Sequence, residues 1–435
     1  MLEKDSLSTE KLDKFNMNLV PFIGTRPSIV IERGRGSSLW DVNGKVYIDA
    51  NSSAYAQNIG HCHPEVIKAA KMQIDELTHV AVIFDTIPLI EYTNLLLSLL
   101  PSKLNKINYC LEGSVAVEGA LKLALKNCKE GKYFISFEHG YHGRTIMGLA
   151  ASWPHPPASF LGYMENFIRL PEAYCYRCSY KLKYPACGIF CAEFIRETIK
   201  NRINGKVAAI IMEPVQGNGG QIDFPIEFYS AIRSICDELD VLLIWDEVQT
   251  GFGRLGKMFA IDYYGVIPDI MVFGKAAGGG FPLAGFVARG DLEPFDDSDH
   301  AFTFGQFTPS LAAAIANVEV IKKEDLLKRC EYLGGLFTSR LKLLKEIYPI
   351  IGNIRGPGLA IGIELVKEKE NKVPAVDEAQ YIVKRGLELG VIFGIDKYNN
   401  LGHVVKIKPP LVTTDEEAET ILDVFEKLLK EVGNL

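Results

Sequence analysis

The sequence predicts an α/β protein in which a large domain with a doubly wound, mainly parallel sheet precedes a smaller α+β C-terminal domain. Between Asn105 and Arg289, apolar runs of strand length alternate with segments whose apolar spacing is helical, as in successive strand-helix units. A long helical pattern follows at about Ser310–Tyr348, and strand and helix patterns mix after it. These two observations place the parallel sheet first and a smaller structure near the end of the chain.

Each predicted element has its own signal in the sequence. Strands are predicted from short apolar runs, helices from apolar residues that recur with helical spacing, and turns from Gly and Asn. The first predicted elements are a hairpin over 27–50 that turns at Asn43-Gly44 and a helix ending near Leu77. The large domain then has a strand at Lys106–Cys110, a helix from Ser114, strands at Tyr133–Phe137 and Lys206–Val215, a helix at Ile226–Asp237, and strands at Val241–Trp245 and Ile270–Phe273. After the long helical pattern come a strand at Gly358–Leu365, a helix at Ala375–Leu389, a strand at Val404–Leu411 and a last helix.

Composition indicates a globular protein without a polyanionic partner. The 435 residues are 48% hydrophobic, which is enough for a large core. A net charge of −7, from 47 basic and 54 acidic side chains, favours neither nucleic acid nor an anionic membrane as partner. The polar, mixed-charge N-terminus does not resemble a signal or transit peptide, and no apolar run reaches membrane-spanning length. We therefore expect a cytoplasmic protein with reduced cysteines.

Two predicted strands end in residues that carry chemistry. Val241–Trp245 is followed by Asp246, and Ile270–Phe273 is followed by Gly274-Lys275. Ligands of open α/β sheets bind beyond the carboxyl ends of the strands, so both side chains are expected to face one ligand. A desolvated lysine can react as a neutral amine. An amine for an aldehyde and a carboxylate for a ring nitrogen suit pyridoxal phosphate.

An apolar run followed by Asp-Glu is also typical of the magnesium-binding strand of nucleotide hydrolases. Such enzymes need a P-loop in which Gly-Lys is followed by Ser or Thr. In this chain Gly-Lys is followed instead by Val46, Tyr133, Val207, Met258 and Ala276. The hydrolase interpretation is therefore rejected.

The segments WDEVQTGFGRLG and FGKAAGGGFPLAG resemble the signature of the class III pyridoxal-phosphate aminotransferases, the omega-amino-acid (4-aminobutyrate/ornithine-like) type. The resemblance continues from about Gly34 to the C-terminus. It implies fold type I, with Lys275 forming a Schiff base with the cofactor and Asp246 facing the ring nitrogen. It also implies an N-terminal segment (1–55) that packs with the small domain, a cofactor-binding large domain (56–309), and a linking helix with the small domain (310–435).

Gly113 and Ser114 form a turn that feeds a helix. Backbone N–H groups at a helix start, together with a hydroxyl, can bind phosphate, although an ordinary capped helix has the same pattern. The resemblance implies that this turn holds the cofactor phosphate. It further implies that Thr303 contacts the phosphate from the neighbouring subunit, which predicts a homodimer, or a dimer of dimers, with shared active sites.

The resemblance assigns four further residues to the cofactor. Tyr141-His142 matches the position whose aromatic ring stacks on the pyridine, and a flat cofactor needs such an apolar face. Val248 is expected on the opposite face of the ring, because alternate residues of a strand share a side. Gln249 is expected to hydrogen-bond the ring oxygen.

Two residues are assigned to substrate. Glu213 lies in EPVQG, which in the family sits beside the substrate. Lys406 stands where many relatives have an arginine that grips a carboxylate. Lysine keeps the charge but lacks the bidentate fork. Carboxylate binding is therefore expected, without a preference for 2-oxoglutarate.

These assignments predict an aminotransferase that moves an amino group from an omega-amino acid or related amine to a 2-oxo acid. An amino-acid racemase or epimerase on the same scaffold is the main alternative, since it needs the same Lys275 chemistry but no acceptor. A non-catalytic binding module is a third interpretation, and it conflicts with an intact Lys275–Asp246 pair.

No metal is expected at this site. A separate motif, formed by Cys175, Cys178, Cys187 and Cys191, has spacing that could ligate zinc or a cluster. Free cysteines also occur as small apolar core residues. The sequence leaves both interpretations open.

Overall fold

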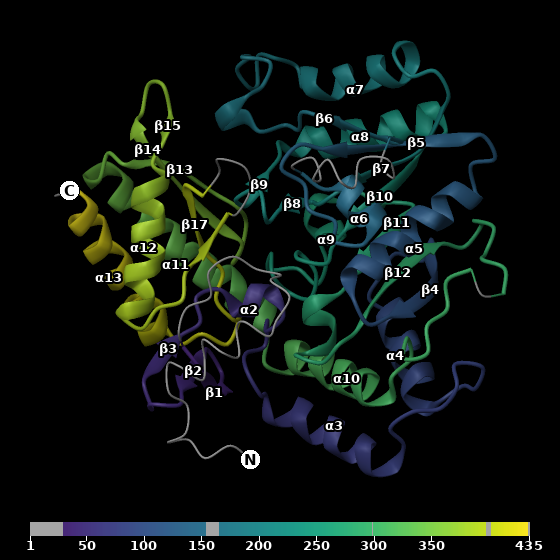
Figure 1. Cartoon of the computed structure of the whole chain (residues 1–435), viewed down its shortest axis with the longest axis horizontal. Helices are drawn as coiled ribbons and strands as arrows, with labels where there is room; N and C mark the ends of the chain where they lie inside the picture. Colours follow the sequence, from purple (N-terminus) through teal and green to yellow (C-terminus); the bar gives the residue numbers. More distant parts are fainter. Residues whose placement is uncertain (1–28, 154–164, 298, 397–401, 434–435) are drawn as a thin grey trace, which may run out of the picture.

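A seven-stranded sheet forms the centre of the larger part of the protein (Figure 1). The computed structural model describes residues 29–153, 165–297, 299–396 and 402–433. The strands of this sheet, in spatial order, are β4 (Leu104–Cys110), β12 (Ala284–Arg289), β11 (Ile270–Phe273), β10 (Leu242–Asp246), β7 (Lys206–Met212), β5 (Gly131–Phe137) and β6 (Phe167–Leu170). Only β12 is antiparallel to its neighbours. The predicted mainly parallel sheet is confirmed.

Helices cover both faces of this sheet, as the strand patterns predict. Successive strand residues point to opposite faces, so alternate residues of β7, β10 and β11 enter different cores. Ile211, Ile244 and Val272 belong to the core under α5 (Gly113–Lys126), while Ile210, Leu243 and Met271 belong to the core that includes α8 (Ile226–Leu239). Because both faces are buried, the strands read as continuous apolar runs in the sequence.

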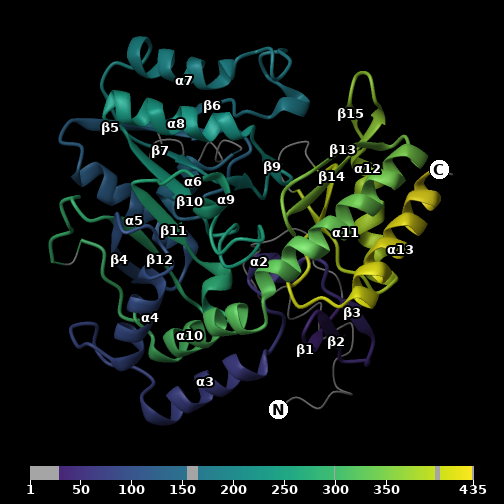
Figure 2. The same ribbon diagram turned by 180° about the vertical axis from the view of Figure 1, so that it is seen from behind.

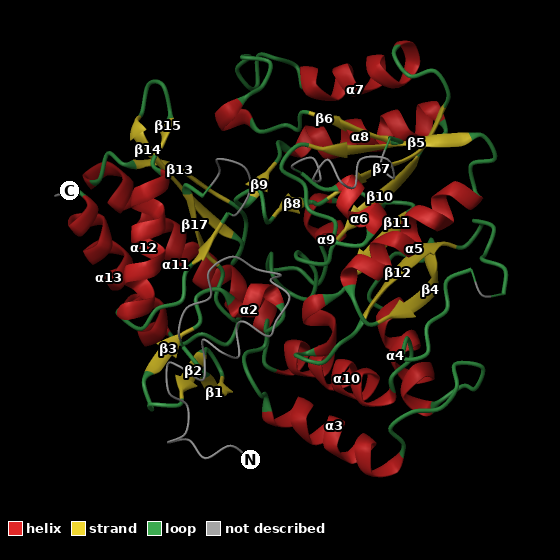
Figure 3. Ribbon diagram, in the orientation of Figure 1, coloured by secondary structure: helices red, strands yellow, loops and turns green. Residues whose placement is uncertain are grey.

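The other helices of the larger part surround these layers (Figure 3). They are α3 (Pro64–Glu76), α4 (Ile87–Leu97), α6 (Ile146–Ala151), α7 (Phe190–Asn201), α9 (Ala260–Tyr264) and α10 (Thr308–Lys323). Two short strands, β8 (Val215–Gln216) and β9 (Ile222–Asp223), pair after β7. Within the described ranges, no helix combines the length and apolar character needed to cross a membrane.

The smaller part is built on an antiparallel sheet, seen from both sides in Figures 1 and 2. Its strands are β13 (Ile351–Arg355), β14 (Ile361–Glu368), β15 (Val373–Pro374), β16 (Gly394–Ile395) and β17 (Val404–Ile407). Its helices are α11 (Leu326–Ile347), α12 (Val376–Glu388) and α13 (Asp415–Val432). This mixture confirms the predicted α+β character of the C-terminal region.

The long helical pattern after Ser310 forms two helices instead of one. The helices α10 and α11 are separated at Asp325, whose φ angle is 51°. Aspartate tolerates this left-handed conformation better than most residues because its short side chain can hydrogen-bond locally. Neither glycine nor proline marks the break, so apolar periodicity alone did not reveal it.

The N-terminal strands pack against C-terminal elements. β2 (Ser38–Asp41) pairs with β1 (Ile31–Arg35) and with β3 (Val46–Ile48), and the predicted turn at Gly44 has a φ angle of 83°. The Ile48 N–H donates to Gly390 O at 2.8 Å. These contacts support the proposed association of the N-terminal segment with the small domain. The exact boundaries, 55/56 and 309/310, remain a prediction.

The four-cysteine motif begins in η3 (Cys175–Arg177), after β6, and ends in the first turn of α7, which contains Cys191. All four cysteines are free thiols, and they line one small cavity of about 20 Å³. The part of the chain that the structure describes has no cluster of three or more His, Cys, Asp or Glu side chains suited to a metal ion. The zinc interpretation thus gains no support from the fold.

Candidate active site

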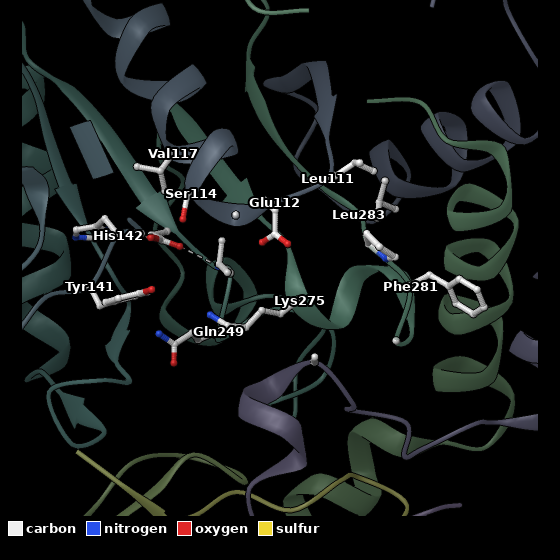
Figure 4. A pocket seen from close by; sticks show the side chains of 17 residues that line it. Leu111, Glu112, Ser114, Val117, Tyr141, His142, Gln249, Lys275, Phe281 and Leu283 are labelled. Carbon is white, nitrogen blue, oxygen red and sulfur yellow. Dashed lines mark hydrogen bonds and ion pairs between the residues drawn. The ribbon is translucent and has the colours of Figure 1, made fainter. Parts of the chain in front are cut away.

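The polar residues that follow the parallel strands meet at one edge of the central sheet. β4, β5, β7, β10 and β11 all run in the same direction, so their carboxyl ends face the same crevice. A cavity of about 340 Å³ lies there (Figure 4). Eight residues predicted for the cofactor line it: Gly113, Ser114, Tyr141, His142, Asp246, Val248, Gln249 and Lys275. The fold therefore brings together residues from segments that are far apart in the sequence.

Asp246 is oriented by two hydrogen bonds. Its Oδ2 lies 2.8 Å from Nδ1 of His142, and its Oδ1 accepts the Val248 N–H at 3.1 Å. Asp246 and His142 are both buried. His142 was predicted only as a cofactor contact, and no sequence signal pairs it with a carboxylate 104 residues away. The pair holds the carboxylate in one orientation at the end of β10.

Lys275 is separated from β11 by Gly274 and begins the short 3₁₀ helix η4 (Lys275–Gly278). Its φ angle of 46° is in the left-handed region, which is strained for a lysine. The Asn317 amide supports η4 by donating to Ala276 O at 2.9 Å and to Ala277 O at 3.3 Å. Burial lowers the pKa of Lys275, while Asp246 and Glu213 oppose that shift. The amine therefore loses its proton more readily than an exposed lysine does.

The turn after β4 is closely packed against its neighbours. A Cβ atom on Gly113 would lie 3.0 Å from Cγ1 of Val248, and one on Gly143 would lie 2.5 Å from Oγ of Ser114. Ser114 Oγ also accepts the Arg144 N–H at 3.1 Å. Because α5 starts at Gly113, the positive end of its dipole adjoins the cavity. This geometry suits an anion.

Glu213 and Lys406 adjoin the cavity without being among the described residues that line it. Glu213 accepts the Tyr141 N–H at 2.8 Å and, with its other oxygen, the Gln249 amide at 3.1 Å. Burial raises the pKa of Glu213 to about 7. Lys406, on β17 of the smaller part, donates to Gly217 O at 3.3 Å. The predicted substrate residues are thus next to the predicted cofactor residues.

Thr303 is exposed and lies outside the described lining of this cavity. Its predicted role requires a second subunit, so that role remains a prediction.

Sequence reasoning missed several residues that line the cavity. They are Ala56, Leu111, Glu112, Val117, Gly143, Phe281, Pro282 and Leu283. Leu111 and Glu112 directly precede the glycine-serine turn, and Phe281 follows the glycine run after Lys275, so proximity to the motifs could have found them. Ala56 has no such signal, because it is far in the sequence from all of these motifs.

The donor set of the cavity fits pyridoxal phosphate. Lys275 supplies an amine for its aldehyde, Asp246 a carboxylate for its ring nitrogen, and Tyr141 an aromatic face. Ser114 and the N-terminus of α5 supply a hydroxyl and backbone N–H groups for its phosphate. Each functional group of the cofactor finds a complementary group here.

Comparisons with known proteins agree with this site. The family model described as aminotransferase class-III matches residues 23–429. A leucine/methionine racemase of Thermococcus litoralis is 35% identical, over 94% of this chain and 92% of its own. An acetylornithine aminotransferase of Methanocaldococcus jannaschii is also 35% identical, over 94% and 95% respectively.

One similar protein of known structure contains the cofactor. It is an amine transaminase from an uncultivated Pseudomonas species in its pyridoxal-phosphate-bound form, with a TM-score of 0.87, 27% identity, and coverage of 95% of this chain and 98% of that one. The chain belongs to the class III aminotransferases, which are pyridoxal-phosphate-dependent enzymes of fold type I.

Proposed function

We propose that this aminotransferase takes its amino group from an omega-amino acid or a related amine, such as 4-aminobutyrate, and passes it to a 2-oxo acid. The placement of the Lys275 amine and the Asp246 carboxylate in a single cavity supports the cofactor chemistry, and the buried Lys406 amine nearby supports a donor that carries a carboxylate. Pyridoxal phosphate, when bound, supplies an electron sink for the charge left when a donor C–H bond breaks. The protein must hold the cofactor, orient the donor and move the proton.

Lys275 is the residue proposed to move that proton. Its lowered pKa favours the neutral amine, which is the form able to remove a proton from the donor carbon and return it elsewhere. Asp246 is proposed to keep the ring nitrogen protonated. The bond to His142 supports this role because it fixes the carboxylate before the cofactor arrives.

The remaining cofactor residues are proposed to position the ring. Gly113 and Ser114 would bind the phosphate, and Tyr141 and Val248 would lie on the two faces of the ring. Gln249 would hydrogen-bond the ring oxygen. The Gln249 amide donates a hydrogen bond to the Glu213 carboxylate, and this bond restricts the rotation of the Gln249 side chain.

Lys406 and Glu213 are proposed to bind the donor. A lysine at the end of a flexible stem can neutralise one carboxylate without imposing a planar, bidentate geometry. Both donor and oxo acid carry such a carboxylate, so one cation can serve both half-reactions. Burial raises the pKa of Glu213, and this side chain is proposed to pair with Lys406 when no substrate carboxylate is bound.

We also propose a homodimer, or a dimer of dimers, in which the partner's Thr303 completes the phosphate site. Phe302 and Phe304, on either side of Thr303, are exposed, and so are Ile83 and Ile87. Exposed apolar groups of this kind favour an interface. Light scattering of the purified protein tests this, and a monomer with bound cofactor would contradict it.

A donor panel tests the proposed activity. The enzyme is incubated with 4-aminobutyrate, ornithine, lysine, β-alanine and alanine, each with pyruvate or 2-oxoglutarate. We expect at least one omega-amino donor to give equal amounts of aldehyde product and new amino acid. Reaction only with alpha-amino donors would contradict the proposed donor class.

A racemase remains the alternative, because two of the relatives are named as racemases, the second being an alanine/serine racemase of Pyrococcus horikoshii. The enzyme is incubated with a single enantiomer of leucine, methionine or alanine, without any oxo acid. Loss of optical activity without keto product would favour the racemase. A requirement for the oxo acid, with keto product formed, would favour amino transfer.

A further inference from the structure

A turn beside the cavity has an unusual backbone. Ser52, Ser53, Ala54 and Tyr55, labelled α2, have φ angles of 40°, 45°, 58° and 75°. Residues other than glycine rarely adopt this left-handed region, and we call Ser52–Tyr55 the left-handed turn. It lies between the two parts of the protein in both views (Figures 1 and 2), and the next residue, Ala56, lines the cavity. Strain of this kind persists only where the surroundings enforce it.

Contacts from the preceding N-terminal segment and from the larger part hold the first half of the left-handed turn. The Asp49 carboxylate accepts the Ser53 N–H at 2.8 Å and the Ser53 hydroxyl at 3.2 Å. Arg254 donates to Oγ of Ser52 at 2.9 Å. Asp49 is itself fixed by His61, 2.8 Å away. The second half of the turn carries Tyr55, whose hydroxyl accepts a hydrogen bond from the Gln221 amide and whose ring centroid lies 5.4 Å from the Arg254 guanidinium.

Lys408 supplies the contact from the smaller part. Its amine lies 3.7 Å from the centroid of the Tyr55 ring and donates to Asn51 O at 3.2 Å, an oxygen that also accepts the Ala54 N–H at 3.0 Å. The Lys408 side chain is 2% exposed and forms no ion pair with any carboxylate in the described ranges. Burial, with Lys406 beside it, lowers the pKa of Lys408. Its amine therefore acts on the turn by direct contact and hydrogen bonding.

One edge of the smaller part thus contacts two segments beside the cavity, because Gly217 packs against Gln249 of the lining and the left-handed turn precedes Ala56. Lys406 lies in β17, and Lys408 comes directly after the end of that strand. Lys406 contacts the Gly217 loop, and Lys408 contacts the left-handed turn. We propose that Lys408 is a positioning residue that holds the left-handed turn and thereby fixes the cavity wall at Ala56. This inference rests on one part of the proposed function, namely that the donor binds in the cavity.

The test compares three variants as cofactor-loaded enzymes. Lys408→Met removes the amine but keeps the length of the side chain, Lys408→Arg keeps N–H donors, and Lys427→Met is a matched control on the exposed face of α13. Hydrogen exchange of the amides of 51–57 is measured by mass spectrometry. One lost hydrogen bond predicts about tenfold faster exchange in Lys408→Met, with Lys408→Arg closer to wild type. Lys427→Met should exchange as wild type does.

Steady-state kinetics supply the second readout. We expect KM for the donor to rise about tenfold in Lys408→Met while kcat and the visible absorption of the cofactor change little. If Lys408→Met fails to fold, Tyr55→Leu removes the ring under the amine and should loosen the same amides more than Tyr55→Phe, which loses only the hydroxyl bonded to Gln221. Unchanged exchange would overturn the contact, and faster exchange with unchanged KM would overturn its role in the cavity wall. The exchange result needs no turnover, so it stands even if the proposed donor class is wrong.

Discussion

The proposed cofactor end and the proposed donor end of the site are built in different ways. At the cofactor end, Asp246 and Lys275 follow neighbouring strands of one sheet, so correct strand order is enough to bring them together. At the donor end, Lys406 reaches Gly217 from a different sheet and from 189 residues further along the chain. The first pair depends on the sheet alone, whereas the second depends on how the two parts dock.

A buried charge cluster secures that docking. Glu364 of β14 accepts bonds from Arg355 at 2.5 Å and from Arg177 and Tyr174 of the larger part. Burial opposes ionisation, yet His403 and the two arginines keep the pKa of Glu364 low. Arg355 also donates to Gly220 O at 2.9 Å, in the loop that Lys406 contacts. The donor end thus relies on long-range contacts that the cofactor end does not need.

Removing Lys275 should have the largest effect. Lys275→Ala loses both the covalent link and the proton-transferring group, and proton transfer alone contributes about 10²- to 10⁴-fold. We expect turnover to fall at least about 10³-fold and the visible absorption of the lysine-bound cofactor to disappear. Lys427→Ala is the matched control. Retention of both activity and absorption in Lys275→Ala would contradict the role of this residue.

Neutralising Asp246 should be the next largest change. Asp246→Asn keeps the shape of the side chain but removes the buried charge opposite the ring nitrogen, and breaking such a pair costs about 3–5 kcal/mol. We expect kcat to fall by about 10²- to 10³-fold while cofactor still binds. Asp423→Asn, on the surface of α13, serves as control. A kcat equal to that of the control would show that the carboxylate is not needed.

Changes at Lys406 should be smaller and should depend on the donor. A hydrogen bond to a charged group contributes about 1.5–3 kcal/mol, so Lys406→Met should raise KM for 4-aminobutyrate about 10- to 100-fold. Butylamine lacks the carboxylate, and its KM should hardly change. Lys406→Arg should restore the binding of 4-aminobutyrate. Equal losses for both donors would mean that Lys406 acts through the fold instead.

The smallest effect concerns pH. Burial raises the pKa of Glu213 from 4.5 to about 7. Between these values the folded protein keeps a proton that the unfolded chain has lost, so the stability contributed by Glu213 falls as pH rises through this window. Glu213→Gln should remove that fall. Its Tm relative to wild type should rise by a few degrees between pH 4.5 and pH 7.5, as measured by calorimetry.

Glu247 offers a matched comparison for Glu213. Its pKa is also raised by burial to about 7, but its carboxylate caps α9 by accepting the Ala260 N–H at 2.7 Å, whereas the Glu213 carboxylate bonds Tyr141 and Gln249 of the cavity lining. Glu247→Gln should change the pH dependence of stability in the same direction. Only Glu213→Gln should alter the pH profile of kcat/KM. If both variants have the same pH profile of kcat/KM, Glu213 has no role in the reaction.

The comparison of the two ends also explains which predictions succeeded. The strands before Asp246 and Lys275 were predicted to within a residue, because an apolar run bounded by polar residues is a local signal. The break at Asp325 was missed because no glycine or proline marks it. The contact between His142 and Asp246 was also missed, since nothing local in the sequence indicates which carboxylate a buried histidine meets.

The sequence by itself determined the parallel sheet, the positions of Asp246 and Lys275 at its edge, and hence the chemistry of the cofactor. Strand length, apolar patterning and motif residues are properties of short segments, so they can be interpreted without coordinates. Only the tertiary structure decided that Lys406 meets Gly217, that Lys408 lies over Tyr55, and that Ala56 lines the cavity. These contacts join segments far apart in the chain, and their partners are fixed by how the two parts pack together.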